Sequence, residues 1–510
     1  MARKTVGPPE TVSPHLEENL DFFTEKLGIG ISIDVLVKGL TIGGKKGALV
    51  FIDGFTNGDV VTLILQNLTQ LNREDIFPDP FTKLTRVKIP YLEIETSDQL
   101  SELMDQMLVG QMIIFLDGEK EAIIMDVREF PVRGPEEPDT ERLTRGSRDG
   151  FVETLMFNIA LTRRRVRDPG LRVEAIKAGR RSKTDVAILY INDIADPELV
   201  EEVKTRLDNI DIDGLPMAEK SIEEFIVEGR WSIFPLVRYT ERPDVAAMHL
   251  YEGHVIMMVD TSPAAIIAPA TFFHHVQHAE EYRQSILSGV YVRWIRFLGI
   301  FISMFLAPLY LLVSLHPELL PEMLDFIGPE EVGNVPLFIQ FIIVHLGIDL
   351  IRMAGVHTPD PLATAMGLIA ALLIGEIAIE VGIFTPEVLL YGGLTAVGMF
   401  STPSYELSLS NRLVHLFMLV VTGLFRLPGF IGGLVIIFIR LATNKSFGVP
   451  YLWPLLPFNM KALWSIIMRR PVPIHEKRPS ILKTQDEDRI TTEEGGKQIG
   501  NEKKGRKKKK

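Results

Sequence analysis

The 510-residue sequence contains no cysteine. Disulfide bonds, thiolate metal sites, iron–sulfur clusters and cysteine nucleophiles are therefore excluded together. The N-terminus, MARKTVGPPETVSPHLEENL, also lacks the apolar stretch of about 7 to 15 residues that a signal peptide needs, so we expect residues 1–290 to stay in the cytoplasm. A formal net charge of −12 argues against nucleic acid as a partner.

Motifs of nucleotide and metal enzymes are missing as well. Gly28 and Gly30 begin a GxG pattern, but Ile33 stands where a dinucleotide fingerprint has its third glycine, and no GxxxxGK[ST] phosphate loop is present. The histidines of HHVQH at 274–278 are spaced like metal ligands, yet they lack the glutamate of an HExxH site. We prefer a polar helix face for them, and expect no enzyme activity, cofactor or bound metal.

Hydrophobic residues make up 46% of the chain but are unevenly distributed. Residues 1–290 have the character of soluble α/β sequence, whereas 297–441 contains apolar runs almost without basic residues. At about 150 residues per domain, the length suggests roughly three domains. We expect an α/β two-lobed cytoplasmic domain followed by an α-helical transmembrane domain at 291–445, with about four spans plus a broken re-entrant hairpin.

The soluble part divides into two lobes joined by a polar arm. Residues 1–127 contain β-branched runs at 31–42 and 47–53 around a GGKK turn, then helical patterns and two short apolar strands. Residues 128–146, rich in proline, glutamate and arginine, form the arm. Residues 147–290 alternate between strand-like and helix-like segments, which indicates a second α/β lobe.

A helix is expected at 152–159, where apolar residues recur at i, i+3, i+4 and i+7. Ser147 or Asp149 can cap its N-terminus. Several arginines between 163 and 167 lie at its C-terminal end. We prefer the interpretation that they complement the helix dipole. The alternative is a contact between lobes or subunits. A strand is expected further along, at 234–239.

The first membrane span is predicted at Phe297–Leu315, directly after Arg293, Trp294 and Arg296. The segment beyond it carries several acids and no lysine or arginine. The positive-inside rule therefore places the soluble half inside.

A second span, Val335–Ile351, is followed closely by Arg352, which shares one helical face with His345 and Asp349. Ionisable groups in a span normally face protein or water, not lipid. The stripe is either an ion pair that packs helices near the inner surface, which we prefer, or part of a polar path.

The third span, Leu362–Ile383, combines acids with small residues. Glu376 and Glu380 stand one turn apart on one face of the helix. Because a charge at the bilayer centre costs about 3 kcal/mol, two carboxylates on this face indicate a water-filled lumen. Subunits assembled around the face would form rings of acids that attract cations. Alternatively, both glutamates are protonated or lie near the outer interface and only pack. The small residues, which let another helix approach closely, are Gly367, Ala371, Gly375, Ala378 and Gly382.

The remaining apolar segments are short. Val388–Phe400 can cross only with tilt or local thinning. Leu413–Phe425 and Phe430–Ile439 flank a Pro-Gly break and predict a hairpin; a single kinked span is the alternative, but it would place the lysine-rich C-terminus outside. Residues 446–480 are typical of a membrane interface, and 481–510 of a disordered polybasic tail.

Several stretches together resemble the A-subunit (GerA) family of spore germination receptors: Thr144–Leu171, Gly179–Ile191, Ala354–Val356, Gly375–Pro386 and Ser446–Pro457. The motif residues are Arg148, Asp149, Gly150, Phe151, Glu153, Ser446, Phe447, Gly448, Pro450 and Tyr451. SRD at 147–149, where receptor subunits more often have PRE, resembles a sporulation branch of the family and argues against direct nutrient sensing.

The resemblance implies a multi-pass protein of the inner endospore membrane with both termini on the core side. It further implies a homo-oligomer, a pentamer, that acts with other spore germination membrane proteins and releases monovalent cations across the lipid bilayer. Our leading hypothesis is a channel subunit whose third span lines the pore. A non-conducting scaffold that organises germination proteins is the alternative, and a membrane-bound enzyme ranks third because no catalytic constellation is present.

Overall fold

The structure, a computed structural model, describes residues 11–85, 94–129, 137–138, 141–229, 231–321, 323, 328, 334–357, 375, 377–469, 471 and 476–490. The chain divides into two units. The first unit comprises Met1–Glu228, Tyr239–Pro269 and Val472–Lys510, and the second comprises Gly229–Arg238 and Ala270–Pro471.

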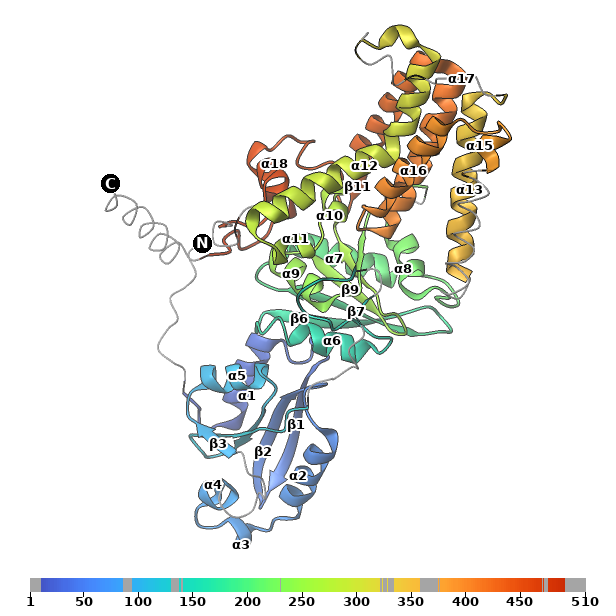
Figure 1. Ribbon diagram of the computed structural model, residues 1–510. Helices are drawn as coiled ribbons and strands as arrows, with labels where there is room; N and C mark the ends of the chain where they lie inside the picture. The colour runs from blue at the N-terminus through green and yellow to red at the C-terminus, as the bar shows by residue number, and fades with distance from the viewer. Residues whose placement is uncertain are drawn as a thin grey trace, which may run out of the picture. The chain divides into compact units, whose positions relative to one another are not determined.

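The first lobe of the first unit is a five-stranded sheet with helices on both faces (Figure 1). Its strands lie in the order β1-β2-β4-β5-β3. Helices α1 and α5 pack on one face around Phe23 and Leu103, and α2 packs on the other around Ile64. The elements are α1 (Leu16–Leu27), β1 (Val35–Ile42), β2 (Lys45–Ile52), α2 (Gly58–Gln70), α3 (Arg73–Ile76), α4 (Pro80–Lys83), β3 (Ile94–Ser97), α5 (Leu100–Leu108), β4 (Met112–Leu116) and β5 (Ala122–Met125). The predicted hairpin is present as the antiparallel pair β1 and β2.

The second lobe contains a second five-stranded sheet, in the order β6-β7-β9-β10-β8. Its elements are α6 (Leu155–Arg163), β6 (Leu171–Ala178), β7 (Thr184–Ile191), α7 (Pro197–Asp208), α8 (Ala218–Ile226), β8 (Arg238–Thr240), α9 (Pro243–Glu252), β9 (Val255–Val259) and β10 (Ala265–Ala268). Of the strand predicted at 234–239, only the last two residues belong to β8. The strands β6 and β10 were not predicted.

The two lobes repeat one topology. Each runs helix, two strands, helix, strand, helix and two strands, with one extra helix pair in the first lobe and one extra helix in the second. In both sheets the first, second, fourth, fifth and third strands lie side by side in that order. The first unit is therefore built from two copies of one α/β arrangement.

A buried ion pair joins the two lobes. Arg163 at the end of α6 donates from Nε to the carboxylate of Asp34 at 2.7 Å, and the two side chains are 1% and 0% exposed. Gly28, with φ of 70°, lies so close to Arg172 that a Cβ would come within 2.6 Å of its Nε. Of the two interpretations of the arginine-rich helix end, Arg163 fits the contact between lobes.

The predicted cap of α6 is wrong. The helix begins at Leu155, and Thr154 occupies the N-cap position without a side-chain hydrogen bond. Neither Ser147 nor Asp149 reaches the helix start, because both are hydrogen-bonded to Arg165, with 2.6 Å between its Nη2 and the carboxylate of Asp149.

Two segments predicted to lie outside the lobes pack on the second lobe. In the described part of the arm, Leu143 is buried. Near the C-terminus, Arg478 donates from Nε to the carbonyl of Tyr251 at 2.8 Å, and Leu482 is buried. The predicted tail at 481–510 is thus folded up to residue 490, and its remaining residues lie outside the described ones.

The second unit is mainly helical (Figure 1). Its elements are α10 (Phe272–Val276), α11 (Glu280–Arg283), α12 (Ile286–Leu315), η3 (Pro317–Leu319), α13 (Leu337–His357), α15 (Ala378–Glu380), α16 (Pro386–Phe400), α17 (Tyr405–Thr443), β11 (Lys445–Ser446), β12 (Val449–Pro450) and α18 (Met460–Ile467). Among the described residues, three helices are long and apolar enough to cross a membrane: Ile286–Leu315, Leu337–Ala354 and Tyr405–Thr443. The predicted third span, 362–383, lies mostly outside the described residues.

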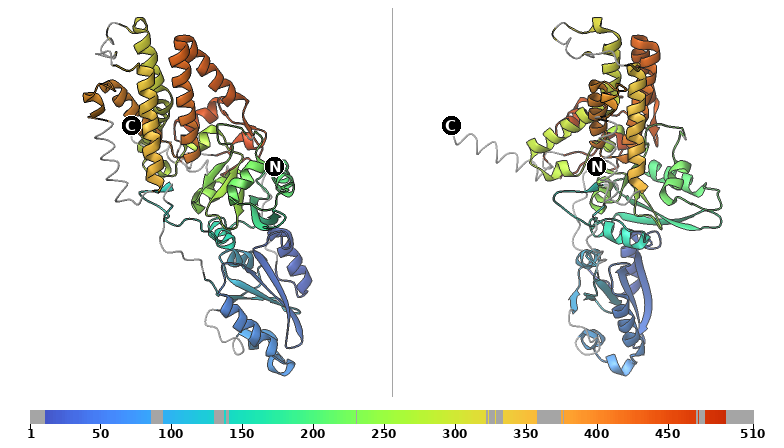
Figure 2. Two further views of the ribbon diagram at one scale, coloured as in Figure 1. Left: turned by 90° about the vertical axis from the view of Figure 1, so that its right-hand side faces the viewer. Right: turned by 45° about the vertical axis from the view of Figure 1, so that its right-hand side comes forward.

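α17 is a helical hairpin, as its Pro-Gly break predicts. Arg426 has non-helical angles, φ 54° and ψ −134°. A Cβ on Gly433 in the second limb would come within 2.7 Å of Met418 in the first, and Figure 2 shows the limbs side by side. The first limb begins at Tyr405 instead of Leu413. At 1.5 Å per residue it is about 30 Å long, which equals the thickness of a bilayer core. It is therefore longer than the short run that was predicted.

Candidate functional site in the helical unit

A buried polar network joins α13 to α17. Arg412 donates from Nη2 to the carboxylate of Asp349 at 2.8 Å and to the carbonyl of His345 at 2.6 Å. Its Nη1 lies 3.0 Å from Nδ1 of His345, and Nε2 of His345 lies 2.9 Å from Nε2 of His415. Both histidines and Arg412 are buried, whereas the side chain of Asp349 is 31% exposed.

The protons of this network follow from its donors. A guanidinium group only donates, so Nδ1 of His345 accepts from Arg412. The neutral ring then carries its proton on Nε2 and donates it to Nε2 of His415, which in turn carries its own proton on Nδ1. A second proton on His345 would face the N–H of Arg412 across 3.0 Å, and a second proton on His415 would face the N–H of His345 across 2.9 Å. The observed packing therefore requires both imidazoles to be neutral.

Two of the three residues in the predicted polar stripe belong to this network. The third, Arg352, instead lies over the ring of Tyr405, 5.2 Å from its centroid. Because His345 and Asp349 reach a neighbouring helix, the contacts favour helix packing over a polar path. Arg412 was not predicted from sequence, because it lies before the apolar run that was expected to begin the hairpin.

The predicted acid pair is described only in part. Glu376 lies outside the described residues. Glu380 is the last residue of α15, is exposed, and makes no ion pair with any residue in the described ranges. It contrasts with Asp349 and Arg412, which pair with each other.

The predicted small-residue stripe has mixed outcomes. Gly367 and Ala371 lie outside the described residues. Ala378 is buried, but a Cβ added at Gly375 would meet no atom of the described ranges within 4 Å. Gly382 lies beyond the helix end with φ of 74°, the left-handed conformation typical of a glycine that terminates a helix. Gly382 was predicted to pack against another helix, but in the structure it ends its own helix.

The first family motif is a structural part of the second lobe. Phe151 is buried, and its N–H donates to the carbonyl of Glu241 at 2.8 Å. Gly150 is also buried, whereas Arg148 and Glu153 are exposed. The buried members hold the extended chain that leads into α6.

The second family motif makes a tight turn after α17. Strands β11 and β12 pair antiparallel, with Ser446 opposite Val449 and Lys445 opposite Pro450. The turn residues Phe447 and Gly448 have φ of 46° and 74°. A glycine adopts this backbone without strain, which explains its place in the motif.

The same motif fastens three segments of the second unit together. The hydroxyl of Ser446 donates to the carbonyl of Leu236 at 2.6 Å and accepts from the N–H of Ala270 at 3.0 Å. Tyr451 is fully buried, and its carbonyl accepts from the N–H of Phe272 at 2.9 Å. The motif therefore links the end of the helical hairpin to the segments that contain Leu236 and Ala270.

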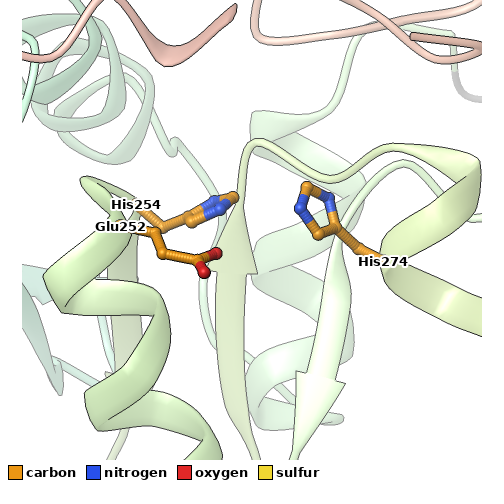
Figure 3. A group of neighbouring side chains, drawn as sticks. All are labelled: Glu252, His254 and His274. Atoms are coloured by element: carbon orange, nitrogen blue, oxygen red, sulfur yellow. The ribbon is translucent and has the colours of Figure 1, made fainter. Parts of the chain in front are cut away.

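Two histidines of the predicted group at 274–278, His274 and His275, lie in α10 of the second unit. His274 projects from α10 (Figure 3), which also draws Glu252 and His254 of the first unit. Nδ1 of His274 accepts from the N–H of Thr271 at 3.0 Å and caps the helix start.

His275 contradicts the prediction of a polar helix face. Its ring is fully buried near Tyr451, with 6.2 Å between the ring centroids. Burial, together with the nearby charge of Arg238, lowers the pKa of His275 to about 3. This histidine is a neutral core residue at physiological pH.

A second buried charge cluster clamps α18 to the start of α12. Glu281 accepts from Nε of Arg293 at 2.6 Å and also pairs with Arg296. Arg469, two residues after α18, donates to the carbonyl of Tyr282 at 2.9 Å. From sequence, Arg293 and Arg296 were predicted only as the basic flank of a span, because their acidic partner Glu281 lies outside that span.

A family model described as "Bacillus/Clostridium GerA spore germination protein" matches residues 21–481. The chain belongs to the GerA family. The resemblance inferred from its motifs is confirmed, and its long apolar helices are those of a membrane protein involved in spore germination or sporulation.

Individual relatives cover nearly the whole GerA-family chain. It is 48% identical over 475 residues to "Stage V sporulation protein AF" of Bacillus subtilis (strain 168), covering 93% of this chain and 96% of that protein. It is 30% identical over 487 residues to "Spore germination protein KA" of the same organism, covering 94% and 89%. The crystal structure of the N-terminal domain of the A subunit of the Bacillus megaterium spore germinant receptor GerK3 matches with a TM-score of 0.42 and 29% identity, over 52% of this chain and 99% of that chain.

Proposed function

We propose that this GerA-family protein is a subunit of a homo-oligomeric ion channel, a pentamer, that releases monovalent cations across the inner endospore membrane during germination. Its N- and C-termini lie on the core side, and other spore germination membrane proteins assemble with it. The predicted third span lines the pore, where Glu376 and Glu380 attract the cations.

The contrast between paired and unpaired ionisable groups supports this proposal. His345, Asp349 and Arg412 satisfy one another between two helices. Glu380 is exposed and has no ionic partner among the described residues, although its helix ends in an otherwise apolar region. A carboxylate in such a place requires water or a cation, and an oligomer with this face inward supplies both.

The test is potassium efflux from liposomes that contain the purified full-length protein. Wild type should release potassium, and Glu376→Gln combined with Glu380→Gln should reduce the rate at least several-fold without changing the oligomer seen by crosslinking. Glu318→Gln is the matched control, because this acid is also exposed but lies in η3, after the first span. An unchanged potassium efflux in the double variant would refute the proposal that a ring of acids attracts the cations.

A non-conducting scaffold is the second candidate. The first lobe exposes large apolar side chains at Ile31, Leu63 and Phe77, and such residues can bind a protein partner. This candidate predicts that liposomes with correctly inserted protein stay tight, and that residues 1–290 alone capture other germination membrane proteins.

A further inference from the structure

The segment between α8 and β8 carries the most exposed large apolar side chain in the described ranges. Trp231 is 93% exposed, and Ile233 is 46% exposed. Both belong to the second unit, although the neighbouring chain on either side belongs to the first. A tryptophan left in water forgoes the burial of a large apolar area, so its environment needs an explanation.

Hydrogen bonds fix this segment to both limbs of the helical hairpin. Ser410, in the second turn of α17, donates from its hydroxyl to the carbonyl of Ile233 at 2.6 Å. Asn444, the residue after the second limb, donates from its side chain to the hydroxyl of Ser232 at 3.3 Å. Trp231 is therefore held at the level where the hairpin begins and ends.

The surrounding side chains have the chemistry of a membrane interface. Tyr405 at the start of α17 is 55% exposed, and the guanidinium of Arg352 lies over its ring. Lys445 directly follows Asn444 and is exposed. Aromatic rings with nearby cations are typical of the headgroup level, where the rings enter the boundary with the acyl chains and the cations meet anionic lipid.

We propose that Trp231 and Ile233 insert into the headgroup region of the bilayer, in the leaflet at which α17 begins and ends. The segment at 231–233 thus anchors this part of the second unit to the lipid that surrounds the helices, while Lys445 lies among anionic headgroups. A lipid occupant is favoured over a protein because the segment continues the exposed aromatic and apolar surface at the same helix ends. The inference does not depend on ion conduction.

The test uses tryptophan fluorescence of the full-length protein in liposomes. The chain has four tryptophans, so replacing Trp294, Trp453 and Trp464 by phenylalanine leaves Trp231 as the only emitter. Its emission should be blue-shifted, quenched by lipids brominated near the top of the acyl chain, and protected from aqueous iodide. A matched variant that keeps only Trp453, which is 7% exposed, should resist both quenchers.

Two outcomes would overturn the proposal. Strong quenching by iodide with none by brominated lipid would place Trp231 in water. Protection from both quenchers would mean that a second copy or another protein covers it. Should the triple variant fail to fold, Trp231→Phe in the otherwise natural chain gives the same information by difference: it should remove a component quenched by brominated lipid, and removal of an iodide-quenched component would contradict the anchor.

Discussion

Replacing Arg412 by methionine should separate the helices α13 and α17. The change removes the donor to Asp349 and to both the ring and the carbonyl of His345. A hydrogen bond to a charged group contributes about 1.5–3 kcal/mol, and removing one partner of a buried ion pair costs about 3–5 kcal/mol. Because Asp349 is 31% exposed and water can partly replace the lost contact, we expect a loss of about 2–3 kcal/mol in the free energy of unfolding.

The assay is unfolding of the full-length protein in detergent, followed by circular dichroism during titration with a denaturing detergent. Arg352→Met is the matched control, because it removes an arginine of α13 whose described contact is the ring of Tyr405, an interaction of about 0.5–1 kcal/mol at exposed sites. Equal destabilisation by the two variants would refute the network as a link between the helices.

A double variant tests the electrostatic part of this reasoning. Combining Arg412→Met with Asp349→Leu replaces the ion pair by apolar groups, which is often neutral or stabilising for a buried pair. The double variant should therefore be more stable than Arg412→Met alone. The coupling energy between the two sites is the loss in the double variant minus the summed losses in Arg412→Met and Asp349→Leu. Simple additivity of the two losses would show that the residues act independently.

Three further variants test other parts of the structure. Arg163→Met leaves Asp34 buried without its partner, which should cost about 3–5 kcal/mol and make the two lobes of the full chain cleavable by protease. Gly382→Ala forces an L-residue to φ of 74° and should destabilise by about 1 kcal/mol. Gly375→Ala, whose new Cβ would meet no atom of the described residues within 4 Å, should not. Burial raises the pKa of Asp149, but hydrogen bonds from Arg165 and Ser147 outweigh this effect and hold the pKa below its usual value. The stabilisation by the Asp149 carboxylate is therefore present above the unfolded pKa of about 3.9 and is lost as pH falls through the folded pKa. Asp149→Asn should be less stable than wild type at pH 6 by about 0.5–1 kcal/mol, and this difference should vanish in strong acid.

Elements that carry their own hydrophobic signal were predictable from sequence. The strands β4 and β5 are short, fully buried apolar runs, MIIFL and AIIM, and α2 has Asn57 as a side-chain cap. In contrast, β6 contains Arg172, Glu174 and Lys177. These charges interrupt the apolar pattern by which a strand is predicted, although Arg172 is itself buried. The topological repeat stayed hidden for the same reason.

The candidate site was only half predictable, because its other half depends on tertiary partners. The spacing of His345 and Asp349 is enough to place both side chains on one helix face. Arg412 follows polar residues that lower the hydropathy at the start of the first limb, so the helix was expected to begin after it, at Leu413. Nothing local indicates that an arginine there is buried; its acceptors lie far away in the chain, on α13.

The ionisable residues of the helical unit can be assigned to structure or to conduction by comparing two measurements. Groups that satisfy one another between helices, such as Arg412 and Asp349, should affect unfolding and potassium efflux together, because the proposed channel would be lost with the fold. An exposed acid without an ionic partner among the described residues, Glu380, contributes little to unfolding, so Glu380→Gln should lower efflux while leaving the unfolding curve unchanged. If Glu380→Gln instead destabilised the protein as much as Arg412→Met, the acid would be packing within the oligomer, and the pore would have to be sought on another helix.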